Sequence, residues 1–313
     1  MTASPALAFI TADEVTELVD PGTARELLRQ TLLDGFDPAG DPARSHLHNA
    51  AGELLLMPSA LNDWVGVKLA GVAPENPRLG LPRIQAVYVL FDGATLSPRL
   101  MIDGVALTSL RTPATSAVAA AELADPDPAK LLVFGSGPQA VGHVVALTTL
   151  FPRLSVSIVA RRAEGVAAAI GKLDALGIEA TAGSADEVPE ADLIVTATSS
   201  SEPVFDGSGV RDGACVLAIG SHSPARRELD STLMGRSLVV VEDLGTARRE
   251  CGDVVIAAGK GRLSLGTLPN LSDLVCGRIS RATDRPNVFK GSGMAWQDLA
   301  VAAGIAERYT GND

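Results

Sequence analysis

In the second half of the chain, short apolar runs alternate with stretches that favour helices. The apolar runs cover residues 131–134, 156–159, 191–198, 214–220 and 237–242, with a shorter one near 178–181. A helix is predicted from Gln139 to about Leu150, and an Ala-rich stretch over 163–175 predicts another. Buried strands separated by helices are typical of a parallel sheet covered on both faces. This half is therefore predicted to be an α/β domain.

The first hundred residues follow a different pattern. Runs at 53–57, 64–72, 84–92 and 98–103 are separated by turn signals such as Asp92-Gly93 and Asp103-Gly104, which predicts a mixed or antiparallel sheet. Thr11 to Glu14 is a capping box that begins one helix, and Pro21 begins a second. A small-residue helix over 114–123 then leads into the α/β half. We therefore expect two domains, because a single core stops growing near ~250–300 residues.

A glycine turn directly follows the 131–134 run and reads Gly135-Ser136-Gly137-Pro138-Gln139-Ala140. A strand, a tight turn and a helix start bring a pyrophosphate against backbone N–H groups at the positive end of the helix. Gly135 permits the turn, Gly137 lets the phosphate approach the main chain, and Ala140 lets the helix pack on the strand. An ordinary glycine-rich loop is the alternative. The flanking strand and helix favour a dinucleotide site.

The next strand ends in Ala160-Arg161-Arg162. A coenzyme with a free 2′-hydroxyl usually meets Asp or Glu at this position. Without a carboxylate there is no repulsion toward a 2′-phosphate, and two guanidinium groups can donate charge-assisted hydrogen bonds to it. The pattern favours NADPH, with NADH as a possible coenzyme. The alternative is that both arginines form a solvated helix start.

Two cations stand in otherwise apolar stretches of the first domain. Lys68 lies inside the 64–72 run. Burying a lysine without a partner is costly and lowers its pKa. Lys68 is therefore expected either to face outward on an edge strand or to be held inward by an anion. Arg111 precedes the small-residue helix at the domain junction. A guanidinium there can hold a carboxylate by two parallel hydrogen bonds.

Composition excludes several classes of function. The net charge of −11 argues against a nucleic-acid surface, which needs a basic stripe. Cys215, Cys251 and Cys276 are scattered and odd in number, so no disulfide framework or redox pair is predicted. The four histidines show no metal-ligand spacing, so no metal is predicted. The sequence begins without the basic region of a signal peptide and has no run of ~18 apolar residues, which predicts a cytoplasmic protein without membrane contact.

Several motifs together resemble one known family over most of the chain. They are Arg44 before a Gly-containing loop, Leu56-Met57-Pro58, Gly66-Val67-Lys68, Asp103-Gly104 with 108–112, the glycine turn, Gly220 with Pro224 and 228–230, Gly252-Asp253, and 290–293 with Asp298. In this order they resemble the ornithine cyclodeaminase/mu-crystallin family. The resemblance implies an α/β fold in which a Rossmann-type parallel-sheet dinucleotide domain, 119–287, is inserted into an α+β substrate and dimerisation domain, 1–118 plus 288–313. It also implies a homodimer.

The resemblance further implies which residues form the site. Arg44, Lys68 and Arg111 would surround a substrate carboxylate, and Lys68 would exchange a proton with the substrate nitrogen. Ser292 and Gly293 would lie near the nicotinamide. The full set of expected coenzyme contacts comes from the glycine turn, the strand ends and the resemblance: Thr112, Gly135, Ser136, Gly137, Pro138, Gln139, Ala140, Ala160, Arg161, Arg162, Thr196, Ala197, Thr198, Ile219, Gly220, Ser221, His222, Ser292 and Gly293.

One position departs from a branch of this family. Its cyclodeaminases resemble one another in carrying Asp where this chain has His222. An imidazole cannot supply that fixed negative charge, which counts against cyclodeamination. His222 is instead a second candidate catalytic proton donor, or a loop residue near the coenzyme without a proton role.

These observations lead us to expect NAD(P)H-dependent reduction of a cyclic imino acid. The substrate would be 1-pyrroline-2-carboxylate or 1-piperideine-2-carboxylate, reduced to L-proline or L-pipecolate. The alternatives are an ornithine cyclodeaminase that forms L-proline and ammonia with recycled NAD+, an amino-acid dehydrogenase or opine-type synthase, and a non-enzymatic NADPH-binding protein similar to mu-crystallin. Three convergent cations count against a pure binding protein.

Overall fold

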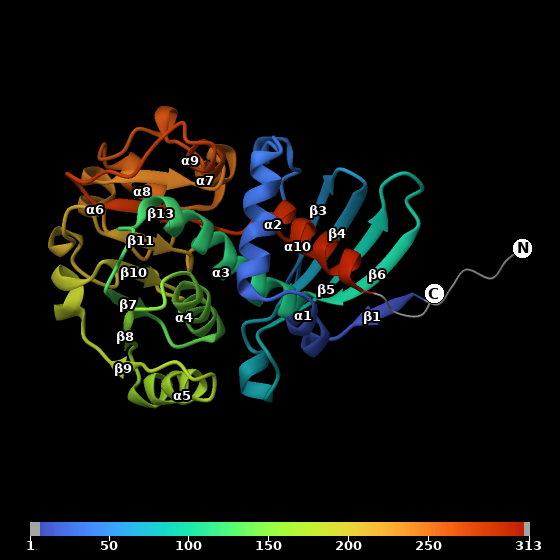
Figure 1. Cartoon of the computed structure of the whole chain (residues 1–313), viewed down its shortest axis with the longest axis horizontal. Helices are drawn as coiled ribbons and strands as arrows, with labels where there is room; N and C mark the ends of the chain where they lie inside the picture. Colours follow the sequence, from blue (N-terminus) through green and yellow to red (C-terminus); the bar gives the residue numbers. More distant parts are fainter. Residues whose placement is uncertain (1–6, 310–313) are drawn as a thin grey trace, which may run out of the picture. The chain divides into compact units, whose positions relative to one another are not determined.

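The computed structural model describes residues 7–309, which belong to two compact units (Figure 1). Unit 1 is Met1–Thr112 with Met294–Asp313, and unit 2 is Pro113–Gly293. Unit 2 is thus inserted into the sequence of unit 1, with boundaries after residues 112 and 293 where we expected them after 118 and 287. Within the described range, no helix combines the length and apolarity needed to cross a membrane.

Unit 1 contains a six-stranded mixed sheet in the order β1-β6-β5-β4-β3-β2. β1 pairs parallel to β6, and the other neighbours are antiparallel. The strands are β1 (Ala8–Ile10), β2 (Ser45–Asn49), β3 (Gly52–Leu61), β4 (Trp64–Val72), β5 (Ile84–Asp92) and β6 (Pro98–Asp103). The predicted mixed sheet is present, with β1 and β2 in addition. β1 is apolar but has only three residues, and β2 is exposed along its whole length, so it lacks the apolar run that marks a buried strand.

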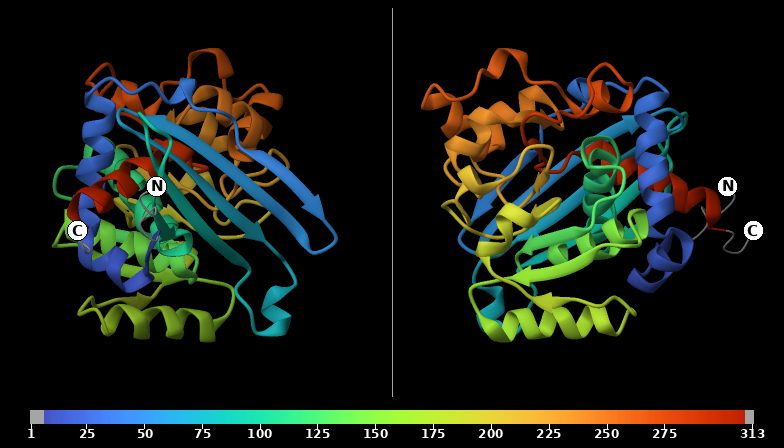
Figure 2. Two further views of the ribbon diagram at one scale, coloured as in Figure 1. Left: turned by 90° about the vertical axis from the view of Figure 1, so that its right-hand side faces the viewer. Right: turned by 60° about the vertical axis from the view of Figure 1, so that its left-hand side comes forward.

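Helices cover one face of this sheet. α10 (Ala295–Arg308) packs on β3, β4 and β5 and lies beside α2 (Pro21–Leu33), as Figures 1 and 2 show. α1 (Ala12–Leu18) begins at the predicted capping box, in which the Thr11 and Glu14 side chains each bond the other's backbone N–H. Two short 3-10 turns, η1 (Pro38–Gly40) and η2 (Asn76–Leu79), lie in the connections.

The helix that leads from unit 1 into unit 2 is longer than predicted. α3 spans Gly104–Leu123, whereas we expected a helix over 114–123. The Asp103 carboxylate accepts hydrogen bonds of 2.9 Å from the backbone N–H groups of Val105 and Ala106, so Asp103-Gly104 begins a helix instead of closing a turn. Arg111 therefore lies on a helix and does not precede one.

Unit 2 contains a seven-stranded parallel sheet in the order β12-β13-β11-β10-β7-β8-β9. The strands are β7 (Lys130–Phe134), β8 (Ser155–Val159), β9 (Thr181–Ala182), β10 (Leu193–Thr196), β11 (Cys215–Ala218), β12 (Leu238–Val241) and β13 (Asn287–Lys290). The run predicted near 178–181 contributes only the two residues of β9. The C-terminal segment of the first domain was expected from residue 288, but β13 pairs with β11 and β12 because all four of its residues are buried in this sheet.

Six helices accompany the parallel sheet, and the carboxyl ends of its strands share one edge. The helices are α4 (Pro138–Leu150), α5 (Ala163–Asp174), α6 (Ser231–Arg236), α7 (Leu244–Glu250), α8 (Gly252–Gly259) and α9 (Leu271–Val275), with 3-10 turns η3 (Ala185–Glu190), η4 (Gly207–Gly209) and η5 (Leu265–Thr267). Open α/β sheets bind their ligands at the carboxyl edge. The loops that begin there carry most of the predicted coenzyme contacts.

Candidate active site

Lys68 is the centre of a buried charged cluster in unit 1. It lies on β4, an inner strand, on the face that packs against α10. The residue is 3% exposed, and its Nζ donates hydrogen bonds to Asp298 Oδ2 at 2.7 Å and Thr108 Oγ1 at 3.2 Å. Of the two alternatives stated for Lys68, an inward position held by an anion is the one observed.

Arg111 shares the same carboxylate. Its Nε donates to Asp298 Oδ1 at 3.1 Å, and its NH1 donates to Gln297 Oε1 at 2.9 Å. Arg111 is 4% exposed and Asp298 is fully buried. Two successive residues of α10 therefore fix the guanidinium, and Asp298 joins both predicted cations.

Burial changes the proton affinity of Lys68. The pKa of its ammonium group is lowered from 10.5 to about 7, mainly because burial removes water, and next because of the positive charge of Arg111. The charge of Asp298 and its hydrogen bond oppose this shift. Near neutral pH, Lys68 can therefore both hold and release a proton.

Arg44 completes the set of cations predicted in this domain. It directly precedes β2 and is half-buried. Its charge also lowers the pKa of Lys68, which places the guanidinium within electrostatic reach of the ammonium group. The cluster thus brings three cations near the carboxylate of Asp298, and cations of this kind suit an anionic ligand.

Asp41 positions the start of α10. Its carboxylate accepts hydrogen bonds from Ser59 Oγ at 2.6 Å and from the backbone N–H of Trp296 at 2.8 Å, and burial raises the pKa of the group. Trp296 packs on Phe36 with ring centroids 5.6 Å apart. These contacts fix the turn of α10 that presents Gln297 and Asp298 to the cluster. The resemblance named Asp298 without a role, and an acidic residue on an apolar helix was the signal that could have marked it.

In unit 2, the glycine turn has the form that a pyrophosphate requires. Gly135 adopts φ 127°, and a Cβ there would lie 2.4 Å from the carbonyl oxygen of Ala197, so only glycine fits. A Cβ on Gly137 would meet no atom within 4 Å, and Gly137 begins α4 without a side-chain cap. The cap residue offers no side chain to the first N–H groups of this 13-residue helix, and such groups can bind a ligand. Ala140 is fully buried behind the turn, and Pro138 and Gln139 are the first residues of α4.

The predicted arginine pair lies beside this turn. Arg161 and Arg162 are both exposed between β8 and α5. β8 pairs with β7, and the backbone N–H of Gly135 donates to Val159 O at 2.8 Å. A Cβ on Gly165, near the start of α5, would lie 2.7 Å from Ser136 Oγ. The turn, Ala160 and the two arginines are therefore neighbours at one edge of the sheet.

A buried glutamate holds the ends of β10 and β11 together. Glu228 accepts hydrogen bonds from the hydroxyls of Thr196 at 3.0 Å and Thr198 at 2.7 Å, and from the Gly220 backbone N–H at 2.7 Å. Burial raises the pKa of Glu228. Both threonine hydroxyls thus donate to Glu228 within the protein, and these bonds hold the strand ends together. Ala197 lies between them and contacts Gly135.

Lys290 fixes the loop that follows β11. Its Nζ donates to the carbonyl oxygens of Ala218, Ser221 and Gly291 at 3.2, 2.7 and 2.6 Å. Asp253 Oδ2 is 3.8 Å away, and Asp253 Oδ1 accepts two backbone N–H groups from 228–229. Ile219 and Gly220 follow β11, Ser221 is buried, and His222 is exposed. An exposed imidazole is a weaker candidate for a directed proton transfer than the buried Lys68.

Glu242 positions the last two predicted contacts. At the end of β12, its Oε2 accepts the backbone N–H groups of Ser292 at 2.8 Å and Gly293 at 2.9 Å. Glu242 was not among the predicted site residues, although an acidic residue directly after an apolar strand was a visible signal. Thr112, the remaining predicted contact, follows Arg111 on α3 at the last residue of unit 1.

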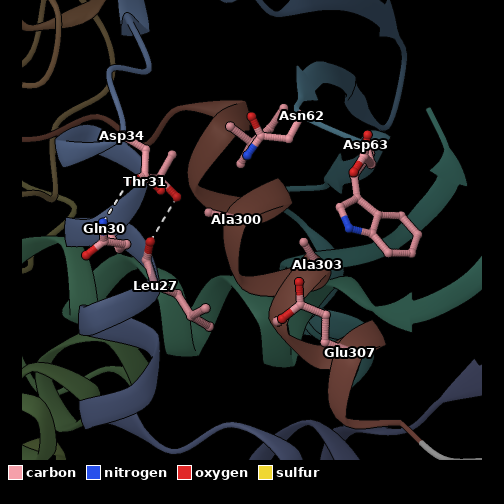
Figure 3. Close-up of a pocket in the computed structure, with 12 residues that line it drawn as sticks. Leu27, Gln30, Thr31, Asp34, Asn62, Asp63, Ala300, Ala303 and Glu307 are labelled. Carbon is pink, nitrogen blue, oxygen red and sulfur yellow. Dashed lines mark hydrogen bonds between the residues drawn. The ribbon is translucent and has the colours of Figure 1, made fainter. Parts of the chain in front are cut away.

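A separate cavity of about 250 Å³ lies in unit 1 between α2, α10 and the β3–β4 turn (Figure 3). Asp34, Asp63 and Glu307 contribute carboxylates to its lining, together with the indole of Trp64. Carboxylates repel one another at short range. This cavity is therefore unsuited to a carboxylate substrate, whereas the Lys68 cluster attracts one.

Comparison with known proteins gives consistent results. The model of the ornithine cyclodeaminase/mu-crystallin family matches residues 28–313. The chain is 32% identical over 304 residues to a Delta(1)-pyrroline-2-carboxylate/Delta(1)-piperideine-2-carboxylate reductase of Azospirillum brasilense, covering 96% of each chain. It is similar to the Thermococcus litoralis Delta(1)-pyrroline-2-carboxylate reductase solved with NADH and L-proline, with TM-score 0.89, 25% identity, and 96% and 97% of the two chains covered. An archaeal alanine dehydrogenase dimer with bound NAD gives TM-score 0.88 at 27% identity, with 96% and 95% covered.

Proposed function

The chain belongs to the ornithine cyclodeaminase/mu-crystallin family, and on this premise we propose that it reduces the C=N bond of a cyclic imino acid. The substrate class is 1-pyrroline-2-carboxylate or 1-piperideine-2-carboxylate, and the products are L-proline or L-pipecolate. The observation that carries the proposal is the buried cluster of Lys68 and Arg111 on Asp298, with Arg44 within electrostatic reach.

The cluster has the groups that a cyclic imino acid needs. Arg111 and Arg44 bind the substrate carboxylate, since guanidinium groups pair with carboxylates in a planar, two-bond geometry. Lys68 gives its proton to the imine nitrogen, which makes the C=N carbon a better hydride acceptor. Asp298 accepts a hydrogen bond from the ammonium group of Lys68 and so keeps it in place before the transfer. Thr108 Oγ1 is the second acceptor, and the neutral amine can still donate to it after the transfer.

The residues of unit 2 fit a nicotinamide coenzyme. The open N-terminus of α4 suits its pyrophosphate, and the Oε1 atom of Gln139, at the same end of α4, is buried without a hydrogen-bond partner among residues 7–309. Bound NAD(P)H supplies the hydride. Ser292 and Gly293, which Glu242 holds in place, contribute backbone to the nicotinamide end of the site in this proposal, and the strand ends around Glu228 contribute the rest.

NADPH is the preferred coenzyme in this proposal. Arg161 and Arg162 are exposed beside the glycine turn, with no carboxylate in the sequence 160–162. Two guanidinium groups would attract a 2′-phosphate, which NADH lacks. NADH remains a usable coenzyme, since both neighbours named above were solved with NADH or NAD.

One experiment tests the proposal against its rivals. The purified protein is incubated with each cyclic imino acid, and with pyruvate plus ammonia, in the presence of NADPH or NADH, and coenzyme oxidation is followed by absorbance. We expect turnover with the cyclic imino acids. Turnover with pyruvate and ammonia alone would identify an amino-acid dehydrogenase, the second candidate, which the likeness to alanine dehydrogenase favours.

Cyclodeamination is tested in the same series. L-ornithine with NAD+ should release no ammonia, because His222 cannot provide a fixed negative charge for the substrate amine. Ammonia release without net coenzyme change would assign the chain to the cyclodeaminases. A protein that binds NADPH but turns over none of these compounds would be a binding protein.

A homodimer formed through unit 1 is part of the proposal. The sheet face opposite α10 carries apolar side chains that are only partly buried: Leu56, Pro58, Val67, Leu69, Val87, Val89 and Phe91. An apolar surface of this kind is typical of an interface, and the alanine dehydrogenase neighbour is a dimer. Sedimentation of Val67→Glu should show monomers, whereas Leu79→Glu, at an exposed position in η2, should leave the mass unchanged. The expected cytoplasmic location remains a prediction.

A further inference from the structure

The hairpin of β2 and β3 carries a cluster of potential metal ligands that the sequence analysis did not recognise. His46 and His48 are two residues apart on β2, so both side chains point to the same face of the sheet. Glu53 on β3 pairs directly with His48 in the sheet register. Ligand atoms of all three residues lie within 4.8 Å of one another. No metal-ligand spacing was recognised among the histidines in the sequence. Two histidines separated by one residue can bind the same ion only if they lie on a strand, where both side chains point to one face.

We propose that His46, His48 and Glu53 bind a divalent first-row transition-metal ion such as Zn2+. The Glu53 Oε2 atom lies 2.8 Å from His46 Nδ1 and 3.9 Å from His48 Nδ1. In a tetrahedral zinc site with ligand bonds of about 2.0–2.1 Å, neighbouring ligand atoms are about 3.3 Å apart. The observed distances lie on either side of that value, so small rotations of the side chains make room for the ion.

The hairpin that carries the cluster is held by its own hydrogen bonds and leaves the cluster open to solvent. The hairpin turn is ordered, because Asn49 Oδ1 accepts the backbone N–H groups of Ala51 at 2.9 Å and Gly52 at 3.0 Å. The two imidazole rings are nearly parallel, with centroids 6.0 Å apart and an angle of 17°. The His48 side chain is 75% exposed, which leaves it free to adjust and leaves the fourth coordination position to water.

The donor set indicates which ions fit. Imidazole nitrogens suit Zn2+, Ni2+, Cu2+ and Co2+, whereas Mg2+ and Ca2+ prefer sites made of oxygen atoms. The net charge of −11 favours cations over anions in general. A bound ion would join the edge strand β2 to β3, directly after Arg44. The inference does not depend on the proposed reductase activity, because it concerns only this hairpin.

Equilibrium dialysis of the metal-stripped protein against Zn2+ tests the site, using the chain without any histidine tag. We expect one tightly bound ion per chain, and at least a tenfold weaker affinity in His46→Ala, His48→Ala and Glu53→Ala. His222→Ala removes another exposed histidine and should retain the affinity, as should Ser45→Ala on the same strand. Mg2+ should not compete for the site.

Co2+ provides a second measurement on the same variants. Four-coordinate Co2+ absorbs visible light far more strongly than the hydrated ion, and this absorption should be lost in His48→Ala. If wild type binds no ion, or if His222→Ala weakens binding as much as His48→Ala does, the cluster is an exposed ion pair only and the proposal fails. Because all three side chains are at least partly exposed, their removal should leave thermal unfolding of the metal-free protein unchanged, which serves as the folding control.

Discussion

The two units each bury a lysine beside an aspartate, but the two lysines have different partners. In unit 1, Lys68 donates to two side chains, those of Asp298 and Thr108. In unit 2, Lys290 donates three hydrogen bonds to backbone carbonyl oxygens, with Asp253 only 3.8 Å away. Side-chain partners can rotate and exchange protons, whereas backbone carbonyls are fixed acceptors. Lys68 is therefore suited to chemistry and Lys290 to holding a loop in shape.

The same contrast applies to the carboxylates. Asp298 accepts from two cations that the proposal places on the substrate. Glu228, Asp253 and Glu242 accept from backbone N–H groups of the loops, and Glu228 also accepts from two threonine hydroxyls. Buried charge alone does not identify a catalytic group. The hydrogen-bond partner, a cationic side chain or a neutral group, separates the two roles. Five predictions test this distinction and the coenzyme preference.

Lys290→Met should have the largest effect, on stability. It removes the side-chain donor of the Ser221 and Gly291 carbonyl oxygens, whereas Ala218 O keeps the backbone N–H of Gly291. It also leaves the buried Asp253 without its nearby cation. Removing one partner of a buried ion pair costs about 3–5 kcal/mol. Urea unfolding should show a loss of this size, and the double variant Lys290→Met/Asp253→Asn should recover part of it. A loss below about 1 kcal/mol would mean that Lys290 has no structural role.

Lys68→Ala should mainly affect the reaction. We expect kcat/KM for the cyclic imino acid to fall at least a hundredfold, about 2.7 kcal/mol in activation free energy, because the proton donor is lost. The free energy of unfolding should change less than in Lys290→Met, since Asp298 keeps its bond to Arg111. An unchanged kcat/KM would remove Lys68 from the mechanism.

The pH dependence of kcat/KM should report the proton on Lys68. Its pKa is lowered to about 7, so the proton-carrying form is lost above this pH, and the rate of imine reduction should fall. Asp298→Asn removes a charge that favours the protonated form, which lowers the pKa further and should move this fall to lower pH. A loss of packing alone would not move the profile. If kcat/KM of Lys68→Ala falls over the same pH range, the titrating group is the imine nitrogen of the substrate and not Lys68.

This lowered pKa also has a consequence for stability. The pKa of Lys68 is about 7 in the folded chain, and in the unfolded chain it has the ordinary value of 10.5. Between these two pH values the unfolded chain therefore binds more protons than the folded chain. The contribution of Lys68 to the free energy of unfolding therefore rises with pH across this interval and is smallest below about pH 7. In Lys68→Ala this part of the pH dependence should be absent.

Arg161→Ala/Arg162→Ala should give the smallest effect, confined to the coenzyme. We expect KM for NADPH to rise about tenfold while KM for NADH stays the same, because only NADPH has a 2′-phosphate and exposed charge pairs are weak. Arg153→Ala, at another exposed site of unit 2, is the matched control. Equal changes for both coenzymes, or better use of NADH by wild type, would contradict the preference for NADPH.

The features that depend on neighbouring residues could be predicted from the sequence. The glycine turn, the capping box at Thr11 and the alternation of apolar strands with helices are local, and the structure contains all three. Two features were missed for different reasons. The start of α3 has a local signal that was read as a turn, because the Asp103 carboxylate accepts the backbone N–H groups of Val105 and Ala106, two and three residues further along the chain. The position of β13 depends on pairing with strands far away in the sequence.

The residue types by themselves therefore determined a dinucleotide fold, a second sheet with unusual cations, and a family. Only the tertiary structure decided which anion accompanies Lys68, because Asp298 lies 230 positions further along the chain. It also decided that Thr196 and Thr198 bond Glu228, and that two histidines of an edge strand meet Glu53. Local backbone preferences act over a few residues and can be recognised in a sequence, whereas the environment of a buried charge is set by whichever segments fold against it.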